Sequence, residues 1–158
     1  MAAPPGVIDP IAFDRDVRLT IAECIRERGA VPSLDEVAAR VAAPIGAVAE
    51  SFGRLGAART MILQPGSTEI LSFNPFAAGP TDFQVRAGGR DWWALCAWDA
   101  FGVAAALGGD GLVLGRCADV CGVPLEIRLA GEAIGALDGV VMQFGLPARE
   151  WWKDIVFT

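Results

Sequence analysis

The chain contains no histidine and no tyrosine, so any chemistry must come from other side chains. Without histidine, a Ser-His-Asp triad, a histidine-ligated zinc ion and an imidazole general base are all excluded. Thiols, carboxylates, hydroxyls and guanidinium groups remain. The main candidates for reactive side chains are therefore the four cysteines, Cys24, Cys96, Cys117 and Cys121.

Cys96 and Asp99 are three residues apart in the run DWWALCAWDAFGVAAAL, whose apolar spacing predicts one helix over residues 91–107. Residues i and i+3 share a helix face, so the thiol and the carboxylate can serve one site. A cysteine alone is often buried and inert. An aspartate in an apolar helix must be hydrogen-bonded, exposed or functional, because burying a bare charge is costly. The residues themselves leave a reactive pair and a structural pair equally open.

Cys117 and Cys121 form a C-x3-C pair that is followed directly by Gly122. A closed zinc site needs four ligands, and the chain has no second CxxC and no histidine to complete it. Thiolates prefer soft metal ions. We therefore expect a thiophilic ion held by two or three thiolates rather than a structural zinc ion.

The elements of the first half are predicted from apolar spacing and cap residues. A helix is expected over residues 13–28, with Gly29 as its stop, and Ser33 with Glu36 predicts a capping box for the next helix. A third helix is expected over 45–57, with Ile45 among its inward residues, and two strands, near 59–64 and 68–73, flank a Pro-Gly turn. This order is typical of a winged helix.

The winged-helix order raises the possibility of DNA binding, which the residues disfavour. The third helix offers Arg54 and Arg59 but no Asn, Gln or Lys to read base edges. The whole chain is acidic, with a net charge of −6, which is unfavourable for electrostatic binding to nucleic acid. We expect a helical subdomain without nucleic-acid contacts.

The second half is predicted to be β-rich. A Pro/Gly-rich linker is expected at 75–82, followed by a strand and turn in FQVRAGG and then by the helix with Cys96. A short helix is expected in LPAREWWK. The remaining strands are expected near 112–117, 123–129, 139–144 and 154–158. The predicted fold class is α+β, with a winged-helix-like helical subdomain (1–74), a linker (75–82) and a β-rich catalytic domain (83–158).

The runs WALCAWDAFGVAAALGG and CADVCGVPLEIRL resemble the organomercurial lyase (alkylmercury lyase) family. The resemblance spans most of the chain, because this family joins a winged-helix-like subdomain to a β-rich catalytic region. It implies that Cys96 and Asp99 are catalytic and contact the metal, and that Cys117 supports the fold. Cys121 is an additional thiol relative to the family pattern and a candidate metal ligand.

The family's second catalytic cysteine follows a segment resembling REWWKDIVFT, and the printed sequence ends at Thr158, about where that cysteine is expected. Two expectations follow. Either the natural chain continues past an apolar strand, which is an unusual carboxyl terminus, or the second thiol is replaced by Cys121 or lacking.

The function implied by the resemblance is protonolytic cleavage of carbon–mercury bonds, with a small-molecule organomercurial as substrate. No cofactor is expected; Hg(II) is the bound product, and external thiols release it. Two alternatives stay open: a thiophilic-metal binding or sensory protein without turnover, and a member of the fold acting on another organic substrate.

The second alternative would use Asp99 as acid or base in an aromatic pocket. The candidate pocket residues are Trp92, Trp93, Trp98 and Phe101. These aromatic side chains are better explained as core residues.

The sequence also predicts where the protein works. The start MAAPPGVIDP lacks the features of a secretory signal, and no apolar run is long enough to span a membrane. We therefore expect a cytoplasmic protein with reduced cysteines. Its high arginine and low lysine content is typical of a GC-rich bacterial coding sequence. Nothing in the sequence indicates an oligomeric state.

Overall fold

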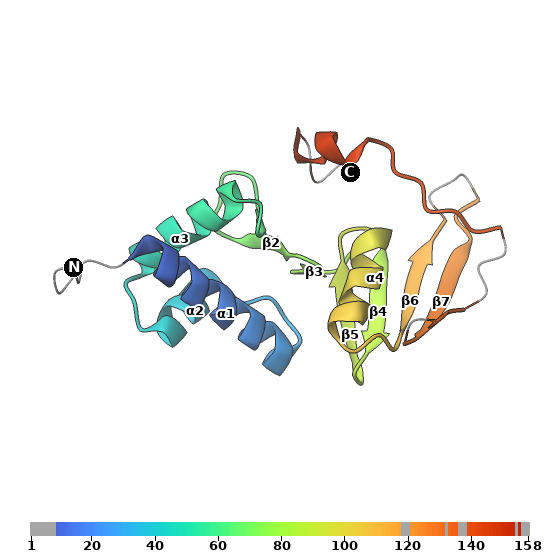
Figure 1. The fold of residues 1–158 in the computed structure, drawn as a ribbon, viewed down its shortest axis with the longest axis horizontal. Coiled ribbons are helices and arrows are strands. Elements are labelled where there is room, and N and C mark those ends of the chain that lie inside the picture. Colours follow the sequence, from blue (N-terminus) through green and yellow to red (C-terminus); the bar gives the residue numbers. More distant parts are fainter. Residues whose placement is uncertain (1–8, 118–120, 132, 136–138, 154, 156–158) are drawn as a thin grey trace. The chain divides into compact units, whose positions relative to one another are not determined.

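The computed structural model describes residues 9–117, 121–131, 133–135, 139–153 and 155. The chain divides into two compact units, Met1–Asn74 and Pro75–Thr158. Helices come first and antiparallel strands follow, so the fold is α+β as the sequence predicts (Figure 1). Within the described ranges, no helix is both long and apolar enough to cross a membrane.

The first unit, which we call the helical unit, contains α1 (Pro10–Arg28), α2 (Leu34–Val41) and α3 (Ile45–Ala57). Gly29 ends α1 with φ 77°, a left-handed conformation that glycine adopts without steric cost. The three helices begin and end close to where cap residues and apolar spacing predict.

The apolar faces of these helices meet in one core. Ile45 is an exception: the spacing predicts it to face inward, but it is 50% exposed in the first turn of α3. Buried apolar side chains of the three helices are Val17, Ile21, Cys24, Ile25, Val37, Ala38, Val48, Phe52 and Leu55. Cys24 is thus a core residue of the helical unit.

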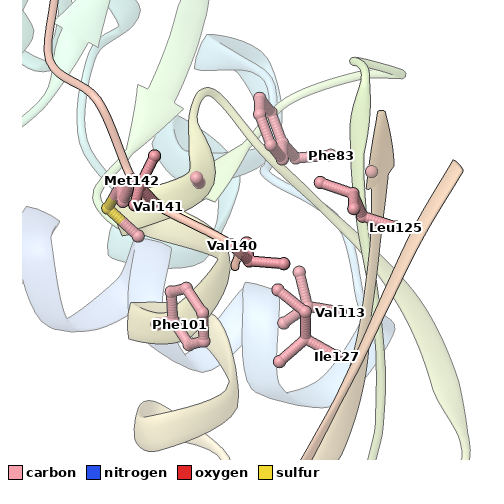
Figure 2. Close-up of a pocket in the computed structure, with 10 residues that line it drawn as sticks. Phe83, Phe101, Val113, Leu125, Ile127, Val140, Val141 and Met142 are labelled. Atoms are coloured by element: carbon pink, nitrogen blue, oxygen red, sulfur yellow. The ribbon is translucent and has the colours of Figure 1, made fainter. Parts of the chain in front are cut away.

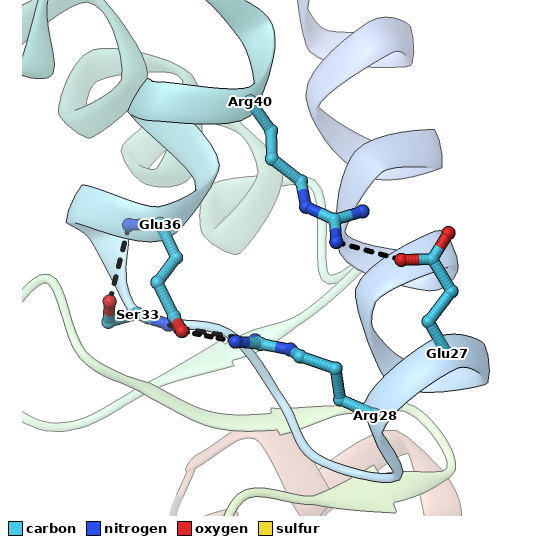
Figure 3. A network of polar contacts seen from close by, with 5 residues as sticks. All are labelled: Glu27, Arg28, Ser33, Glu36 and Arg40. Atoms are coloured by element: carbon cyan, nitrogen blue, oxygen red, sulfur yellow. Dashed lines mark hydrogen bonds and ion pairs between the residues drawn. The ribbon is translucent and has the colours of Figure 1, made fainter.

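A polar network fixes the start of α2 (Figure 3). The Glu36 amide donates to the Ser33 hydroxyl at 3.3 Å, and the Ser33 amide donates to the Glu36 carboxylate at 2.8 Å, which is the predicted capping box. Arg28 at the end of α1 pairs with Glu36, and Arg40 donates to Glu27 at 2.7 Å. These contacts join α1 to α2.

The helical unit ends in a hairpin of β1 (Ile62–Leu63) and β2 (Ile70–Phe73). The strands are antiparallel and flank the predicted Pro65-Gly66 turn, in which Gly66 has φ 69°. Helix, helix, helix and hairpin is the element order expected from the sequence.

The second unit, which we call the sheet unit, contains a five-stranded antiparallel sheet in the order β5-β4-β6-β7-β8. Its strands are β4 (Phe83–Ala87), β5 (Arg90–Ala94), β6 (Gly111–Arg116), β7 (Pro124–Ala130) and β8 (Ala133–Ile134). Helix α4 (Ala97–Ala106) packs on β4, β5 and β6, and the short strand β3 (Phe76–Ala77) packs on β5.

The core of the sheet unit lies between α4 and the sheet. Small side chains on α4 let the helix approach the strands closely: a Cβ on Gly111 would meet the Ala87 and Ala104 methyl groups at 3.4 and 3.5 Å. The buried apolar residues of this core are Val85, Ala87, Trp92, Ala94, Ala100, Val103, Ala104, Val113 and Leu129.

The prediction of one helix over 91–107 is wrong in its first part. Residues 90–94 form β5, which pairs with β4 from Phe83↔Ala94 to Ala87↔Arg90. The turn between the strands has positive φ at both Gly88 and Gly89, the geometry of a tight hairpin. Strand pairing therefore overrides the helical spacing up to Ala94.

Two other expectations concern the last third of the chain. The strand predicted at 139–144 is wrong, because described residues there form neither helix nor strand. The strand predicted at 154–158 lies, apart from Ile155, outside the described residues. The short helix predicted in LPAREWWK is present as the 3-10 helix η1 (Ala148–Lys153). The expected linker at 75–82 contains β3 and lies in the sheet unit.

Candidate active site at the start of helix α4

Cys96 occupies the N-cap position of α4, directly after the bend that follows β5. Its backbone is extended (φ −145°, ψ 176°), and its carbonyl accepts the first helical bond from the Ala100 amide at 3.0 Å. The preceding strand end is anchored by Thr81, whose hydroxyl lies within hydrogen-bond distance of the Ala94 and Phe83 carbonyls. The thiol is thus held between a paired strand and a packed helix.

Asp99 lies at the third residue of α4 and shares a site with Cys96. The thiol and the carboxylate interact, and the Trp98 and Asp99 amides also act on the sulfur. No hydrogen bond of ordinary capping geometry reaches the Cys96 side chain, so the amides provide a weak electrostatic contact rather than a full cap. The predicted pair is therefore brought together at the helix start, not within the helix.

Both groups have raised pKa values. Burial raises the pKa of the Cys96 thiol, the neighbouring Asp99 carboxylate adds to this, and the two amides partly offset it. Burial also raises the pKa of Asp99, and the hydrogen bond from Cys96 partly offsets it. Partial desolvation disfavours both charged forms. The pair therefore retains a proton more readily than the same groups do in water.

An apolar pocket of about 120 Å³ lies between α4, the sheet and the segment 140–142 (Figure 2), and neither Cys96 nor Asp99 is among its lining residues. Ala97, between Cys96 and Asp99 in the chain, is one of its lining residues. The others are Phe83, Phe101, Val113, Gly115, Leu125, Ile127, Val140, Val141 and Met142. No lining residue carries a charge, so the pocket suits a hydrocarbon group.

Of the four aromatic residues predicted to line a pocket, Phe101 does so. Trp92 points into the core, where its indole donates to the Ala87 carbonyl at 3.0 Å and its ring meets Phe76 at 5.3 Å. Trp93 is half-buried in β5, and Trp98 is 61% exposed. The structure therefore places these three tryptophans outside the pocket lining.

Trp98 instead belongs to an aromatic contact between α4 and the last described segment. Its ring meets Phe144 edge-on at 6.3 Å, and Phe144 meets Trp151 at 5.3 Å. The Trp151 indole donates to the Leu146 carbonyl at 2.8 Å. These contacts bring residues 144–151 next to the first turn of α4, on which Cys96 and Asp99 lie.

Several pocket residues were missed from the sequence. Leu125 and Ile127 alternate on β7 and face the same side, a signal that period-2 spacing contains. Val140, Val141 and Met142 are consecutive and all line the pocket, which a strand would not allow because its side chains alternate. The apolar run predicted as a strand at 139–144 is therefore a non-strand segment, and its residues 140–142 line the pocket.

The other cysteines lie on other elements of the chain. Cys24 is buried in the helical unit, whereas Cys117 and the exposed Cys121 lie in the loop between β6 and β7, where their thiols interact. Among the described residues, no group of three or more Cys, Asp or Glu side chains is arranged to hold a metal ion. The predicted ligand set of Cys96, Asp99 and Cys121 thus stays a prediction.

Comparisons with known proteins agree with this picture. Residues 76–158, just over half of the chain, match the family described as Alkylmercury lyase (MerB). A solved structure, "Crystal structure of the mercury-bound form of MerB2", superposes with a TM-score of 0.57 at 22% sequence identity. The match covers 78% of this chain and 66% of that chain, slightly less than two thirds.

Comparison with curated proteins gives no match. At 22% identity, the solved structure shows a shared fold, whereas the family match covers the sheet unit from β3 onwards. The chain belongs to the alkylmercury lyase family.

Proposed function

We propose that this chain cleaves carbon–mercury bonds by protonolysis. The observation that carries the proposal is the contact between Cys96 and Asp99 at the start of α4, a helix that also lines an apolar pocket through Ala97 and Phe101. A thiol suits a soft metal ion, a carboxyl group suits proton transfer, and the pocket suits a hydrocarbon. Family membership supports the same chemistry.

The reaction needs one proton, and the pair can supply it. As the Cys96 sulfur bonds to mercury, its proton passes to the adjacent Asp99 carboxylate. Asp99 then delivers that proton to the carbon as the carbon–mercury bond breaks. The electron pair of that bond becomes the new carbon–hydrogen bond, and Hg(II) stays on sulfur. No electron is gained or lost overall, so no redox cofactor is required.

The raised pKa of Asp99 favours this role. Burial is the main cause, and a general acid works best when its pKa lies close to the working pH. The raised pKa of Cys96 keeps the thiol protonated before mercury arrives, with burial again the main cause. The pair thus holds the one proton that the reaction consumes.

The organic group of the substrate would occupy the apolar pocket. Ala97 lines the pocket and follows Cys96 directly, so a hydrocarbon attached to mercury at Cys96 can extend past Ala97 towards Phe101. At the far side, a Cβ on Gly115 would meet the Phe83 ring at 3.2 Å. We propose that these residues limit the size of the organic group.

Hg(II) prefers two thiolates, and we propose that a small-molecule thiol supplies the second sulfur and releases the product. Reduced thiols of this kind are abundant in the cytoplasm, where we place the protein.

In the helical unit, Arg54 on α3 donates to Asp14 at 2.7 Å and is thus engaged in an ion pair. This pairing supports a winged-helix-like unit that does not bind nucleic acid.

Hydrocarbon release tests the proposal directly. The reduced protein is incubated with a phenylmercury salt and excess thiol, and benzene in the headspace is measured by gas chromatography. We expect catalytic release that depends on the protein. The variant Cys24→Ala serves as a matched cysteine control, because Cys24 lies in the helical unit, and it should retain turnover where it folds.

The same assay in heavy water gives a second readout, because a proton delivered from Asp99 exchanges with solvent. Monodeuterated benzene is expected. Absence of benzene with all of the tested alkyl- and arylmercurials, while the protein is folded and binds Hg(II), would overturn the proposal in favour of a metal-binding protein without turnover.

A further inference from the structure

The loop between β6 and β7 carries two thiols that the proposed reaction does not use. The strands pair up to Arg116↔Pro124, and the Cys117 amide donates to the Val123 carbonyl at 2.8 Å, which closes the base of the loop. Cys117 is half-buried at this base, whereas Cys121 is exposed. The strand pairing thus positions the described part of the loop, in which both cysteines lie.

The two side chains are in contact: the Cys117 thiol hydrogen-bonds to the Cys121 sulfur. The amides of Val123, Cys121 and Gly122 also form hydrogen bonds with that sulfur. Gly122 has φ 55°, a left-handed conformation that helps a turn direct successive amides towards one anion. The loop therefore presents one exposed sulfur beside a second thiol.

We propose that Cys117 and Cys121 form a second binding site, for a soft cation that accepts two thiolates, such as Hg(II) or Cu(I). Two sulfurs suit these ions, whereas a closed zinc site needs four ligands. Within the described ranges no third Cys, Asp or Glu completes such a cluster. The exposed position of Cys121 leaves the site open to ions or to thiol-bound metal from solution.

The two sites differ in what surrounds them. Cys96 and Asp99 are half-buried at the start of α4, a helix that also lines an apolar pocket, whereas Cys121 of the Cys117–Cys121 site is exposed to water. As proposed, it holds an inorganic cation rather than an organic substrate. This site is independent of the proposed lyase activity, and either can be right without the other.

Removal of the other two thiols isolates the site. In the variant Cys24→Ala, Cys96→Ser of residues 1–158, the remaining cysteines are Cys117 and Cys121. The reduced protein is titrated anaerobically with mercuric chloride against a fixed excess of glutathione, following the ultraviolet thiolate-to-mercury absorption. We expect one Hg(II) per chain, with native mass spectrometry showing a single chain per ion.

Replacement of Cys121 by serine in the same background gives the decisive comparison. Cys121 is exposed, so Cys121→Ser should fold normally, which its thermal midpoint checks. Loss of the second, pre-positioned sulfur should weaken binding by roughly 10²–10⁴-fold. The proposal is overturned if Cys121→Ser retains affinity within about threefold, or if the paired form binds Hg(II) only by joining two chains.

Discussion

Helices α2 and α4 both begin with an N-cap residue followed three positions later by an acidic residue, but the two pairs differ in their surroundings. Ser33 and Glu36 start α2 in the helical unit, and Cys96 and Asp99 start α4 in the sheet unit; in both, the first residue is the N-cap and the acid lies three residues later. The first pair forms a complete capping box. The second substitutes a thiol for the hydroxyl and leaves the cap without an ordinary side-chain hydrogen bond.

The surroundings shift the two carboxyl groups in opposite directions. Glu36 is bound by Arg28 and by the Ser33 amide, and these contacts lower its pKa to about 2. Asp99 is half-buried, and burial raises its pKa. An acid beside a guanidinium group is a permanent anion, whereas an acid in an apolar site can hold a proton.

The comparison shows that helix-start geometry brings a donor and an acid together, while the environment decides what the pair does. An exposed pair with an arginine stabilises a helix. A half-buried pair with a thiol can hold a proton, but it caps the helix less well. Such a loss of helix stability is common at functional sites. Variants that exchange the features of the two pairs can therefore separate stability from turnover.

The largest effect is expected for Cys96→Ser. The hydroxyl is a hard, weakly acidic ligand, so mercury binding at this position and benzene release should both be lost. Serine is also a better N-cap than cysteine, so the free energy of unfolding should stay equal or rise by up to about 1 kcal/mol. The headspace assay and urea denaturation measure the two quantities on one sample.

The reverse exchange, Ser33→Cys, is the matched control. It should lower the free energy of unfolding by roughly 0.5–1 kcal/mol and leave turnover unchanged. More than a tenth of wild-type turnover in Cys96→Ser would show that the thiol is not the mercury ligand, and the contrast between the two helix starts would fail.

The next largest effect is expected for Asp99→Asn, which keeps the shape of the side chain and removes its proton-transfer capacity. Turnover should fall by roughly 10²–10⁴-fold, the usual contribution of a positioned acid. Binding of inorganic Hg(II), which needs no proton delivered to carbon, should change by only a few-fold. Single-turnover benzene release and equilibrium binding separate the two steps.

Glu36→Gln removes the corresponding acid of α2 and should leave both readouts unchanged. Equal losses of Hg(II) binding and of carbon protonation in Asp99→Asn would contradict the proton-donor role, because they would identify Asp99 as a metal contact only.

A smaller, graded effect is expected from pH. The competent pair has Asp99 ionised and Cys96 protonated. Burial raises both pKa values, so turnover should fall on the acid side at a pH above the ordinary aspartate range of about 4, as Asp99 becomes protonated. It should fall on the alkaline side above roughly pH 8.5, as Cys96 loses the proton that the reaction consumes.

The pH profile of single-turnover benzene release measures these limits, and Asp99→Asn should abolish the acid-side fall in the residual rate. An acid limb at or below the ordinary aspartate range would contradict the effect of burial on Asp99. Such a limb would instead indicate that the pKa of Asp99 is not raised, as the pKa of Glu36 is not.

Local rules explain why the helical unit was predicted well. Gly29, Ser33 and Glu36 are start and stop signals whose effect does not depend on distant residues, and the buried faces of α1 and α3 follow one period. The i, i+3 spacing also predicted that the side chains of Cys96 and Asp99 meet, because it holds for an N-cap and the third helical residue as it does within a helix.

The sheet unit depends on strand pairing, in part between distant segments, which helical spacing does not reveal. Trp92 and Trp93 continue the helical spacing of α4, yet the pairing of β4 with β5 places them in a strand. The pocket likewise combines α4, β7 and residues 140–142, which are far apart in the chain. Local periodicity therefore could not predict which residues line the pocket.

A stability effect of moderate size is expected for Ser33→Ala. The Glu36 amide loses the Ser33 hydroxyl that accepts its hydrogen bond at 3.3 Å, and an alanine N-cap leaves that amide without a side-chain acceptor. The free energy of unfolding should fall by about 1 kcal/mol, as measured by urea denaturation. Turnover at a temperature where the variant is folded should be unaffected; a parallel loss of turnover would show that α2 contributes to the site.

The smallest effect is expected from the titration of Glu36. Its pKa is lowered to about 2, chiefly by Arg28, so its stabilising contribution is complete above its unfolded pKa of about 4.3 and is lost as the pH falls towards 2. Exposure of the pair to water limits this contribution to a few tenths of a kcal/mol. Wild-type protein should lose slightly more stability than Glu36→Gln between roughly pH 5 and pH 2, by urea denaturation. A larger loss in Glu36→Gln would contradict the lowered pKa, and with it the contrast between an arginine-bound acid and the half-buried Asp99.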